Sequence, residues 1–326
     1  MKKYTAILGI LVAALVLAGL FTRPGASADG ELSIVATIFP EYDWVMEILG
    51  DRAESAQVTL LLDSGVDLHS YQPSVKDMVT LAECDLFLYV GGESDSWVDS
   101  ALAGSANENR IVINLLEVLG EQAKQEELLE GMEQEDHHEE DGHDEEEAEL
   151  DEHVWLSLRN ASLFCQAIRD ALIQLDGEHA DIYRANTEAY LERLAALDSA
   201  FAEAAAQGSR DTLLFGDRFP FRYLADDYGL RCYAAFPGCS AETEASFETV
   251  IFLADKLDAL GLGTVMTLEG SDGKLARTIA DTAKSEDIAI LSMDSMQSVT
   301  AKDVHSGASY LSIMEKNLAV LRQALG

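Results

Sequence analysis

Short runs of β-branched and aliphatic residues recur along the chain, separated by stretches in which apolar residues return every three or four positions. The first pattern is typical of buried strands, and the second of helices that cover a sheet. Strands that alternate with helices favour parallel α/β layers over a β-sandwich or a helical bundle. The predicted strands are residues 32–37, 58–62, 86–90 and 111–114, then 213–215, 231–236, 265–268 and 289–291. Four strands on each side of a helical stretch suggest two similar lobes.

One long helix is predicted between the two groups of strands. Its apolar residues step by 7, 4, 3 and 4 positions, the period of one helix face, at Tyr183, Tyr190, Leu194, Leu197 and Phe201. The helix is predicted to begin near Glu178 and to end at Gly208, with a length of about 45 Å at 1.5 Å per residue. Such a helix can join two lobes as a rigid strut; the alternative is an ordinary helix at the edge of one domain.

The N-terminus has the pattern of a secretory signal peptide. Lys2 and Lys3 precede an apolar run over residues 6–21, and the small residues 26–28 follow it. Cleavage is predicted after Ala28. The run is shorter than the roughly 20 residues that span a bilayer, so a retained anchor is the weaker alternative. The mature protein is therefore predicted to work outside the cytoplasmic membrane, on the periplasmic side or at the cell surface, where disulfides are allowed.

Charge excludes one class of partner and marks one segment. The 326 residues include 59 acidic and 22 basic ones, a net charge of −37, so nucleic acid is excluded as the main partner because phosphate binding needs clustered cations. Residues 121–152 hold 17 of the acids, with His137, His138 and His143 among them. This stretch has no hydrophobic period and is predicted to be a solvated, mobile loop. It is either a weak collector of divalent cations or a soluble linker.

The four cysteines leave their pairing open. They stand at positions 84, 165, 232 and 239, and an even count permits three fully paired connectivities. Cys232 and Cys239 lie on either side of the Pro237-Gly238 turn and form the candidate disulfide. Cys84 and Cys165 lie in apolar stretches, where a buried thiol is expected.

Two of the four histidines outside the acidic stretch have informative surroundings. His69 lies in a polar turn after a predicted strand, at the end of the sheet where α/β proteins bind ligands. His153 lies where the chain turns apolar again after the acidic stretch, whereas His179 and His305 have no motif around them and are expected to be structural or exposed. The chain has no HExxH helix, GxSxG elbow or P-loop, so the sequence gives catalysis little support.

The two histidine segments carry a family resemblance. Residues 67–74 read DLHSYQPS and residues 151–156 read DEHVWL, close to the D-P-H-x-Y-x-P-S and D-P-H-x-W motifs of the zinc- and manganese-binding solute-binding proteins of bacterial ABC importers. The segments 35–40, 91–93, 310–311 and 317–318, and the acidic, His-rich stretch before the second histidine, are similar as well. The resemblance covers nearly all of the mature chain. Taken together, the motifs are specific for this family.

The resemblance implies a fold and a division of the chain. It implies an α/β protein of two Rossmann-like lobes joined by a long rigid helix, with one metal in the cleft between them. On this basis we expect a signal peptide over residues 1–28, a first lobe over 29–177 that includes the acidic loop, a linker helix over 178–208 and a second lobe over 209–326.

The resemblance also implies the metal ligands. His69 and His153 match the two histidines of the first lobe, and Asp294 matches an acidic ligand after the last strand. The position of the third ligand aligns with Arg218, which cannot bind a cation, so the neighbouring Asp217 is the predicted substitute. Glu242 and Glu244 are alternatives for this third oxygen. Arg218 could instead hold a carboxylate near the site.

The resulting prediction is an exported receptor that binds Zn²⁺ and delivers it to a membrane ABC permease as a monomer, without catalysing a reaction. Manganese is the alternative cargo, because two imidazoles with two carboxylates form a harder set than three imidazoles. A secreted zinc-dependent hydrolase and an adhesin-like protein braced by metal are the rival classes. The acylated cysteine of lipid-anchored relatives has no counterpart here, since Leu20 follows Leu17, Ala18 and Gly19, so the sequence does not predict lipid attachment.

Overall fold

The computed structural model describes residues 31–103, 107, 109–132, 149–240 and 244–326. Residues 31–326 form one compact unit. The predicted signal peptide lies outside the described residues, as do the three histidines of the acidic stretch and Glu242. In the described part of the chain, no helix is both long enough and apolar enough to cross a membrane.

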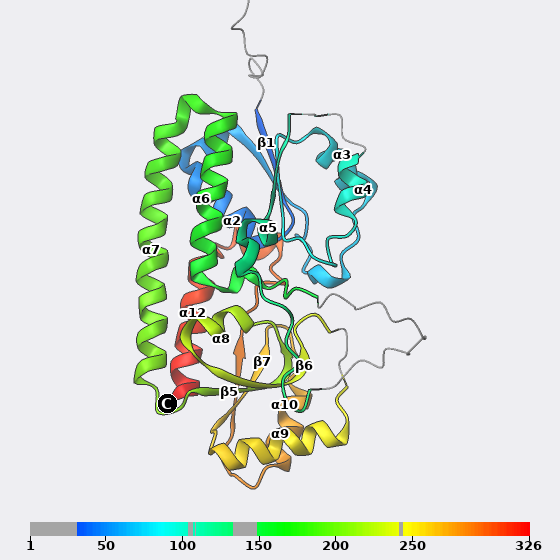
Figure 1. Cartoon of the computed structure of the whole chain (residues 1–326), viewed down its shortest axis with the longest axis vertical. Coiled ribbons are helices and arrows are strands. Elements are labelled where there is room, and N and C mark those ends of the chain that lie inside the picture. The colour runs from blue at the N-terminus through cyan, green and yellow to red at the C-terminus, as the bar shows by residue number, and fades with distance from the viewer. Residues whose placement is uncertain (1–30, 104–106, 108, 133–148, 241–243) are drawn as a thin grey trace, which may run out of the picture. The chain divides into compact units, whose positions relative to one another are not determined.

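Two four-stranded parallel sheets organise this unit (Figure 1). The first sheet has the order β2-β1-β3-β4 and the second has the order β6-β5-β7-β8. Their strands are β1 (Leu32–Ala36), β2 (Ala56–Leu60), β3 (Leu86–Tyr89), β4 (Ile111–Asn114), β5 (Thr212–Phe219), β6 (Arg231–Pro237), β7 (Thr264–Leu268) and β8 (Ala289–Met293). Each predicted strand is confirmed, and the matching strand order confirms two similar α/β halves.

Helices connect the strands and cover the sheets. The helices between the first four strands are α2 (Phe39–Leu49), α3 (Val75–Glu83) and α4 (Val98–Ala103), with short 3₁₀ turns η1 (Gly50–Ser55) and η2 (Leu68–Ser70). α5 (Leu115–Leu119) and the 3₁₀ turn η3 (Gly120–Gln122) follow β4. The later elements are η4 (Val154–Leu156), α6 (Leu158–Leu175), η5 (Gly177–His179), α7 (Ala180–Gln207), α8 (Arg222–Tyr228), α9 (Phe247–Leu260), α10 (Lys274–Thr282), α11 (Ala301–His305) and α12 (Tyr310–Leu325). α9 and α10 pack on the second sheet, and α12 contacts both β8 and α7.

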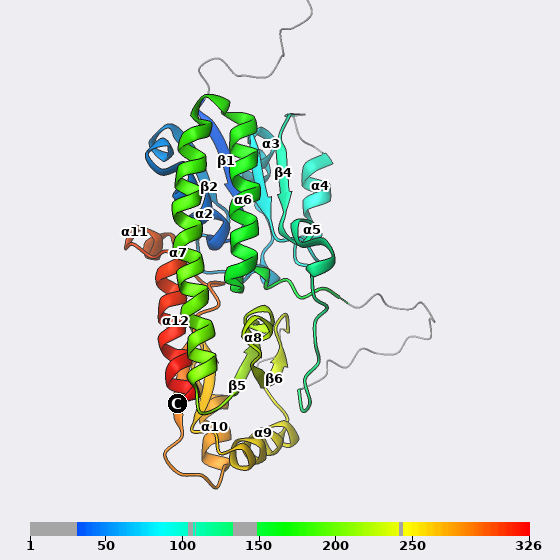
Figure 2. The ribbon, with the colours of Figure 1, turned by 60° about the vertical axis from the view of Figure 1, so that its left-hand side comes forward.

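The predicted long helix is α7, and its bounds agree with the sequence pattern. All five apolar residues of its predicted face are buried. Gly208 follows the last helical residue, and its N–H donates to the carbonyl of Ala204. α7 packs against α2 and α6, which accompany the first sheet, and against α8 and α12, which accompany the second (Figure 2). The strut interpretation is therefore confirmed.

The described part of the acidic stretch is a largely exposed loop, as predicted, but it makes contacts that the sequence did not predict. Residues 123–132, which we call the strap, run from α5 toward α9 along the second sheet (Figure 1). Met132 is buried, and the carbonyl of Gly131 accepts a hydrogen bond from Thr249 of α9. Three ion pairs hold the acidic and basic side chains of the strap: Lys124 with Asp226, Glu127 with Arg222, and Glu130 with Lys256. The sequence did not predict these contacts, because the opposite charges lie far away in the chain on α8 and α9.

A buried carboxyl at the start of α2 predicts a pH effect on stability. One oxygen of Glu41 accepts hydrogen bonds from the N–H groups of Thr37 and Ile38 and from the Thr37 hydroxyl, and the other has no hydrogen-bond partner among the described residues. Burial, with the nearby charge of Asp95, raises the pKa of Glu41 to about 8. The folded state therefore holds a proton that the unfolded chain loses above its ordinary pKa, so this contribution to stability is lost as the pH rises toward 8.

We expect Glu41→Gln to reduce this pH dependence, because the amide keeps the accepting oxygen and does not titrate. Between pH 5 and pH 8 the unchanged protein should lose on the order of 2 kcal/mol more unfolding free energy than the variant. Urea unfolding with a metal chelator present measures the difference. Parallel stability curves for the two proteins would contradict the assignment.

Candidate metal centre

The turn that carries His69 is fixed by its neighbours on both sides. His69 lies in η2, and the N-cap residue Asp67 accepts a hydrogen bond from the His69 N–H at 3.0 Å. Leu68 is buried and anchors the turn in the core, while the His69 side chain keeps 11% of its surface exposed. The imidazole is thus held at the surface of a cavity on a rigid backbone.

The segment that carries His153 is buried more deeply. His153 comes directly before η4, whose three apolar residues have no exposed surface. Asp151 Oδ1 accepts the His153 N–H at 2.9 Å, and the Asp151 carbonyl accepts a hydrogen bond from the Tyr223 hydroxyl of α8. Trp155 Nε1 donates to the carbonyl of Ser295 at 2.8 Å. Residues that follow the second sheet's strands therefore help to fix a histidine that precedes α6.

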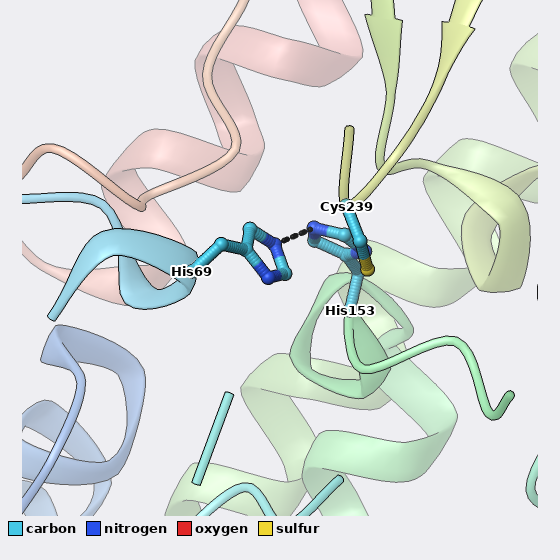
Figure 3. Close-up of side chains that lie close together, drawn as sticks. All are labelled: His69, His153 and Cys239. Atoms are coloured by element: carbon cyan, nitrogen blue, oxygen red, sulfur yellow. Dashed lines mark hydrogen bonds between the residues drawn. The ribbon is translucent and has the colours of Figure 1, made fainter. Parts of the chain in front are cut away.

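The two imidazoles meet edge to edge (Figure 3). His69 Nε2 lies 3.2 Å from His153 Nε2. Two nitrogens bound to one tetrahedral Zn²⁺ at ordinary bond lengths lie about 3.3 Å apart, so this spacing suits a shared ion. The arrangement brings together two ligands that are 84 positions apart in the sequence.

Each imidazole has a partner at its other nitrogen. His69 Nδ1 lies 2.8 Å from Ser94 Oγ and 3.4 Å from Glu152 Oε2, and His153 Nδ1 lies 3.1 Å from Asp151 Oδ1. Oxygen partners of this kind keep the proton on Nδ1 and leave the Nε2 lone pair for a metal. The pairing of each histidine with a carboxylate is common among metal-binding histidines.

Glu152 stands where the resembling family has proline, and the structure shows what it contacts. Its Oε1 accepts the Ser94 N–H at 2.9 Å. Burial raises the pKa of Glu152, but hydrogen bonds from His69 and Ser94 outweigh this effect, and the net shift is downward. Gly92 has φ +81°, and a Cβ there would lie 2.3 Å from Glu152 Oε1, so a glycine is needed beside this carboxylate.

Cys239 is the third member of the cluster. Among the described residues, one group of three or more possible ligands gathers, and it consists of His69, His153 and Cys239, with one ligand atom from each within 4.8 Å of the others (Figure 3). The described cysteines are all free thiols, so the proposed disulfide between Cys232 and Cys239 was wrong. Burial and the charges of Glu126, Glu152 and Asp151 raise the pKa of the Cys239 thiol. A bound divalent cation has the opposite effect on a thiol.

The predicted carboxylate ligands lie outside this group. Asp217 Oδ1 accepts the N–H of Arg218 at 2.9 Å, and its Oδ2 accepts the N–H of Leu268 at 3.2 Å. Asp294 Oδ1 accepts the N–H of Met296 at 2.8 Å, and burial raises the pKa of this carboxyl. Neither carboxylate belongs to the group of possible ligands found among the described residues, so both assignments stay predictions. Glu244, which was an alternative for the third ligand and lies among the described residues, is exposed.

Arg218 has a structural role beside the centre. Its Nη2 lies 2.8 Å from Asp67 Oδ2, in the turn of His69, and its Nη1 donates to the carbonyl of Ser240 at 3.5 Å. Burial raises the pKa of Asp67, but Arg218 and the hydrogen bonds to this carboxylate outweigh it, and the net pKa is lowered. The interpretation that Arg218 holds a carboxylate near the site is confirmed.

A cavity of about 1670 Å³ gives access to the centre. His69, Cys239 and Glu152 line it, together with Glu93, Glu117, Glu126 and Glu149, and the described residues of its lining include no lysine or arginine. A cleft that is lined by acidic side chains and enclosed by low-dielectric protein attracts cations and repels anions. The described cavity therefore favours a positively charged ligand.

These features define the class of protein as a two-lobed α/β protein whose candidate metal centre is built from residues of both halves. The chain belongs to the family of ZnuA, the periplasmic component A of the zinc-uptake complex, whose model matches residues 34–324. The resemblance predicted from the histidine motifs is thereby confirmed.

Known relatives agree with this membership. The chain is 31% identical over 326 residues to the zinc-binding lipoprotein AdcA of Streptococcus pneumoniae serotype 4, covering 99% of this chain and 61% of AdcA. It is 26% identical to the high-affinity zinc uptake system protein ZnuA of Bacillus subtilis, covering 93% and 91% of the two chains. The crystal structure of the Zn(II)-bound ZnuA-like domain of Streptococcus pneumoniae AdcA superposes with a TM-score of 0.70 at 28% identity, over 91% of this chain and 99% of that one. The chain thus spans about three fifths of AdcA.

Proposed function

We propose that this protein binds Zn²⁺ outside the cytoplasmic membrane and delivers it to the permease of an ABC importer. The observation that carries the proposal is the 3.2 Å approach of the two Nε2 atoms, each on a ring whose Nδ1 faces an oxygen partner. This geometry offers two neutral nitrogens to one ion without rearrangement, and imidazole is a favoured zinc ligand. Two relatives, the zinc-binding lipoprotein AdcA and the high-affinity zinc uptake system protein ZnuA of Bacillus subtilis, support zinc as the cargo.

The proposed ligands from the first half of the chain are His69 and His153. Asp217 and Asp294 are retained as predicted oxygen ligands, to be tested individually. The protein is proposed to act as a monomeric binding protein and to catalyse no reaction. Membership in a family of zinc-uptake components supports transport over hydrolysis.

Elemental analysis and a competition titration test the binding step. Protein prepared without added metal should contain zinc in preference to manganese. After the metal is removed, it should compete with a chromophoric chelator for Zn²⁺. Protein that carries no zinc and does not compete with the chelator would refute the proposal.

A gene deletion in the host bacterium tests delivery. We expect the deletion strain to grow poorly when zinc is chelated and to recover when Zn²⁺, but not Mn²⁺, is added. If the deletion strain grows normally under chelation although the protein binds zinc tightly in vitro, the proposed delivery to the permease is contradicted. The proposed zinc binding would then still stand.

A further inference from the structure

The centre needs a third ligand that the predicted carboxylates do not supply in this structure. The side chain at the position aligned with the family's third ligand is Arg218, which carries a positive charge and is paired with Asp67. The neighbouring Asp217 uses both carboxylate oxygens to accept main-chain N–H groups. Two imidazoles alone leave a divalent ion without any anionic ligand, which is unfavourable in a partly buried site.

Cys239 lies beside the two imidazoles. Its Sγ falls within the 4.8 Å group formed with the two imidazoles, on the turn that follows β6. Gly238 packs directly against His153, because a Cβ at position 238 would lie 2.9 Å from His153 Cε1. The backbone before the cysteine is therefore in contact with one of the two histidines.

Two further contacts hold this turn from either side. Glu126 of the strap accepts the Cys239 N–H at 3.1 Å. Arg218 donates to the carbonyl of Ser240 and pairs with Asp67, so one guanidinium links the turn of Cys239 to the turn of His69. The arginine fixes the spacing of the two ligand-bearing turns and does not bind the ion itself.

We propose that the Cys239 thiolate is the third metal ligand of this protein, so that the centre is a two-histidine, one-thiolate site selective for Zn²⁺ over Mn²⁺. The inference rests on the proposed zinc-binding function and specifies its ligand chemistry. On binding, the S–H bond breaks, a Zn–S bond forms and the proton leaves to solvent. A soft thiolate suits Zn²⁺ and similar ions, whereas Mn²⁺ prefers carboxylate and water oxygens.

Cobalt substitution tests the ligand directly. Co²⁺ bound to the reduced, metal-free protein is expected to show an intense thiolate-to-cobalt charge-transfer band in the near ultraviolet. Cys239→Ser should remove this band, and Cys232→Ser, which changes the half-buried thiol on β6, should retain it. A wild-type complex without the band, or a band that survives Cys239→Ser, would overturn the assignment.

Selectivity provides a second measurement. Cys239→Ser is expected to weaken Zn²⁺ binding at least tenfold while changing Mn²⁺ binding much less. Cys239→Asp should reduce the ratio of Zn²⁺ affinity to Mn²⁺ affinity more than Cys239→Ser does. Circular dichroism of the metal-free proteins checks that each variant is folded. Tight zinc binding that is equal in wild type and Cys239→Ser contradicts only the thiolate ligand, whereas weak zinc binding by the wild type contradicts the proposed function.

Discussion

Replacing His69 with alanine is expected to lower the affinity for Zn²⁺ at least a thousandfold, a loss of about 4 kcal/mol. The imidazole supplies one of two nitrogens that lie 3.2 Å apart, and no neighbouring described side chain can take its place without moving. His153→Ala should have an effect of the same size. Competition with a chromophoric chelator, followed by calorimetry, measures both losses.

A second histidine variant shows whether a loss of zinc affinity comes from the lost ligand or from a general effect of removing a histidine. His305 is exposed on α11, and its Nδ1 faces the carbonyl of Ala301, so His305→Ala should bind zinc like the wild type. His69 lies on a turn that is held by Asp67 and Leu68, so the metal-free His69→Ala protein should keep native circular dichroism. A folded His69→Ala variant with wild-type affinity would remove this residue from the centre.

Gly238→Ala is expected to weaken zinc binding roughly a hundredfold, about 3 kcal/mol, without unfolding the protein. A Cβ at this position would lie 2.9 Å from His153 Cε1 and 2.9 Å from the carbonyl of Phe219. Contacts this short force either the imidazole or the turn of Cys239 to move. The imidazole and the turn both carry proposed ligands, so the ligand atoms would no longer be placed to bind one ion together.

The control is another glycine next to a strand of the second sheet. In the described part of the chain, no heavy atom lies within 4 Å of a Cβ added at Gly263, and its φ is not positive, so Gly263→Ala should leave the affinity unchanged. Thermal unfolding of both metal-free variants tests whether stability alone explains the result. Equal affinities for Gly238→Ala and Gly263→Ala would show that the packing of Gly238 on His153 does not matter for binding.

The thiolate assignment bears on the choice between zinc and manganese. Two imidazoles with two carboxylates form a ligand set that manganese tolerates well. Two imidazoles with one thiolate favour zinc, so the identity of a single third ligand decides the predicted preference. The Asp217→Ala and Asp294→Ala variants compare the two ligand sets directly, since a loss above tenfold is expected only if the replaced aspartate coordinates the ion.

The sequence by itself determined the repeating elements of the fold. Short β-branched and aliphatic runs predicted the strands, and the apolar face from Tyr183 to Phe201 predicted α7, because periodicity and end signals are local properties of the chain. The two histidines were also predicted from local motifs. Their turns depend on neighbours in the sequence, since Asp67 and Asp151 accept the N–H groups of the histidines two positions later.

Only the tertiary structure decided which other groups reach these histidines. Cys239 lies 86 positions after His153, and its approach depends on how the second sheet packs near the first. The strap looked like a solvated loop in the sequence because the partners of its charges, Arg222 and Lys256, lie about a hundred positions away. The pairing of Arg218 with Asp67 spans 151 positions. Local patterns encode elements and turns, whereas contacts between distant turns arise only when the whole chain has folded.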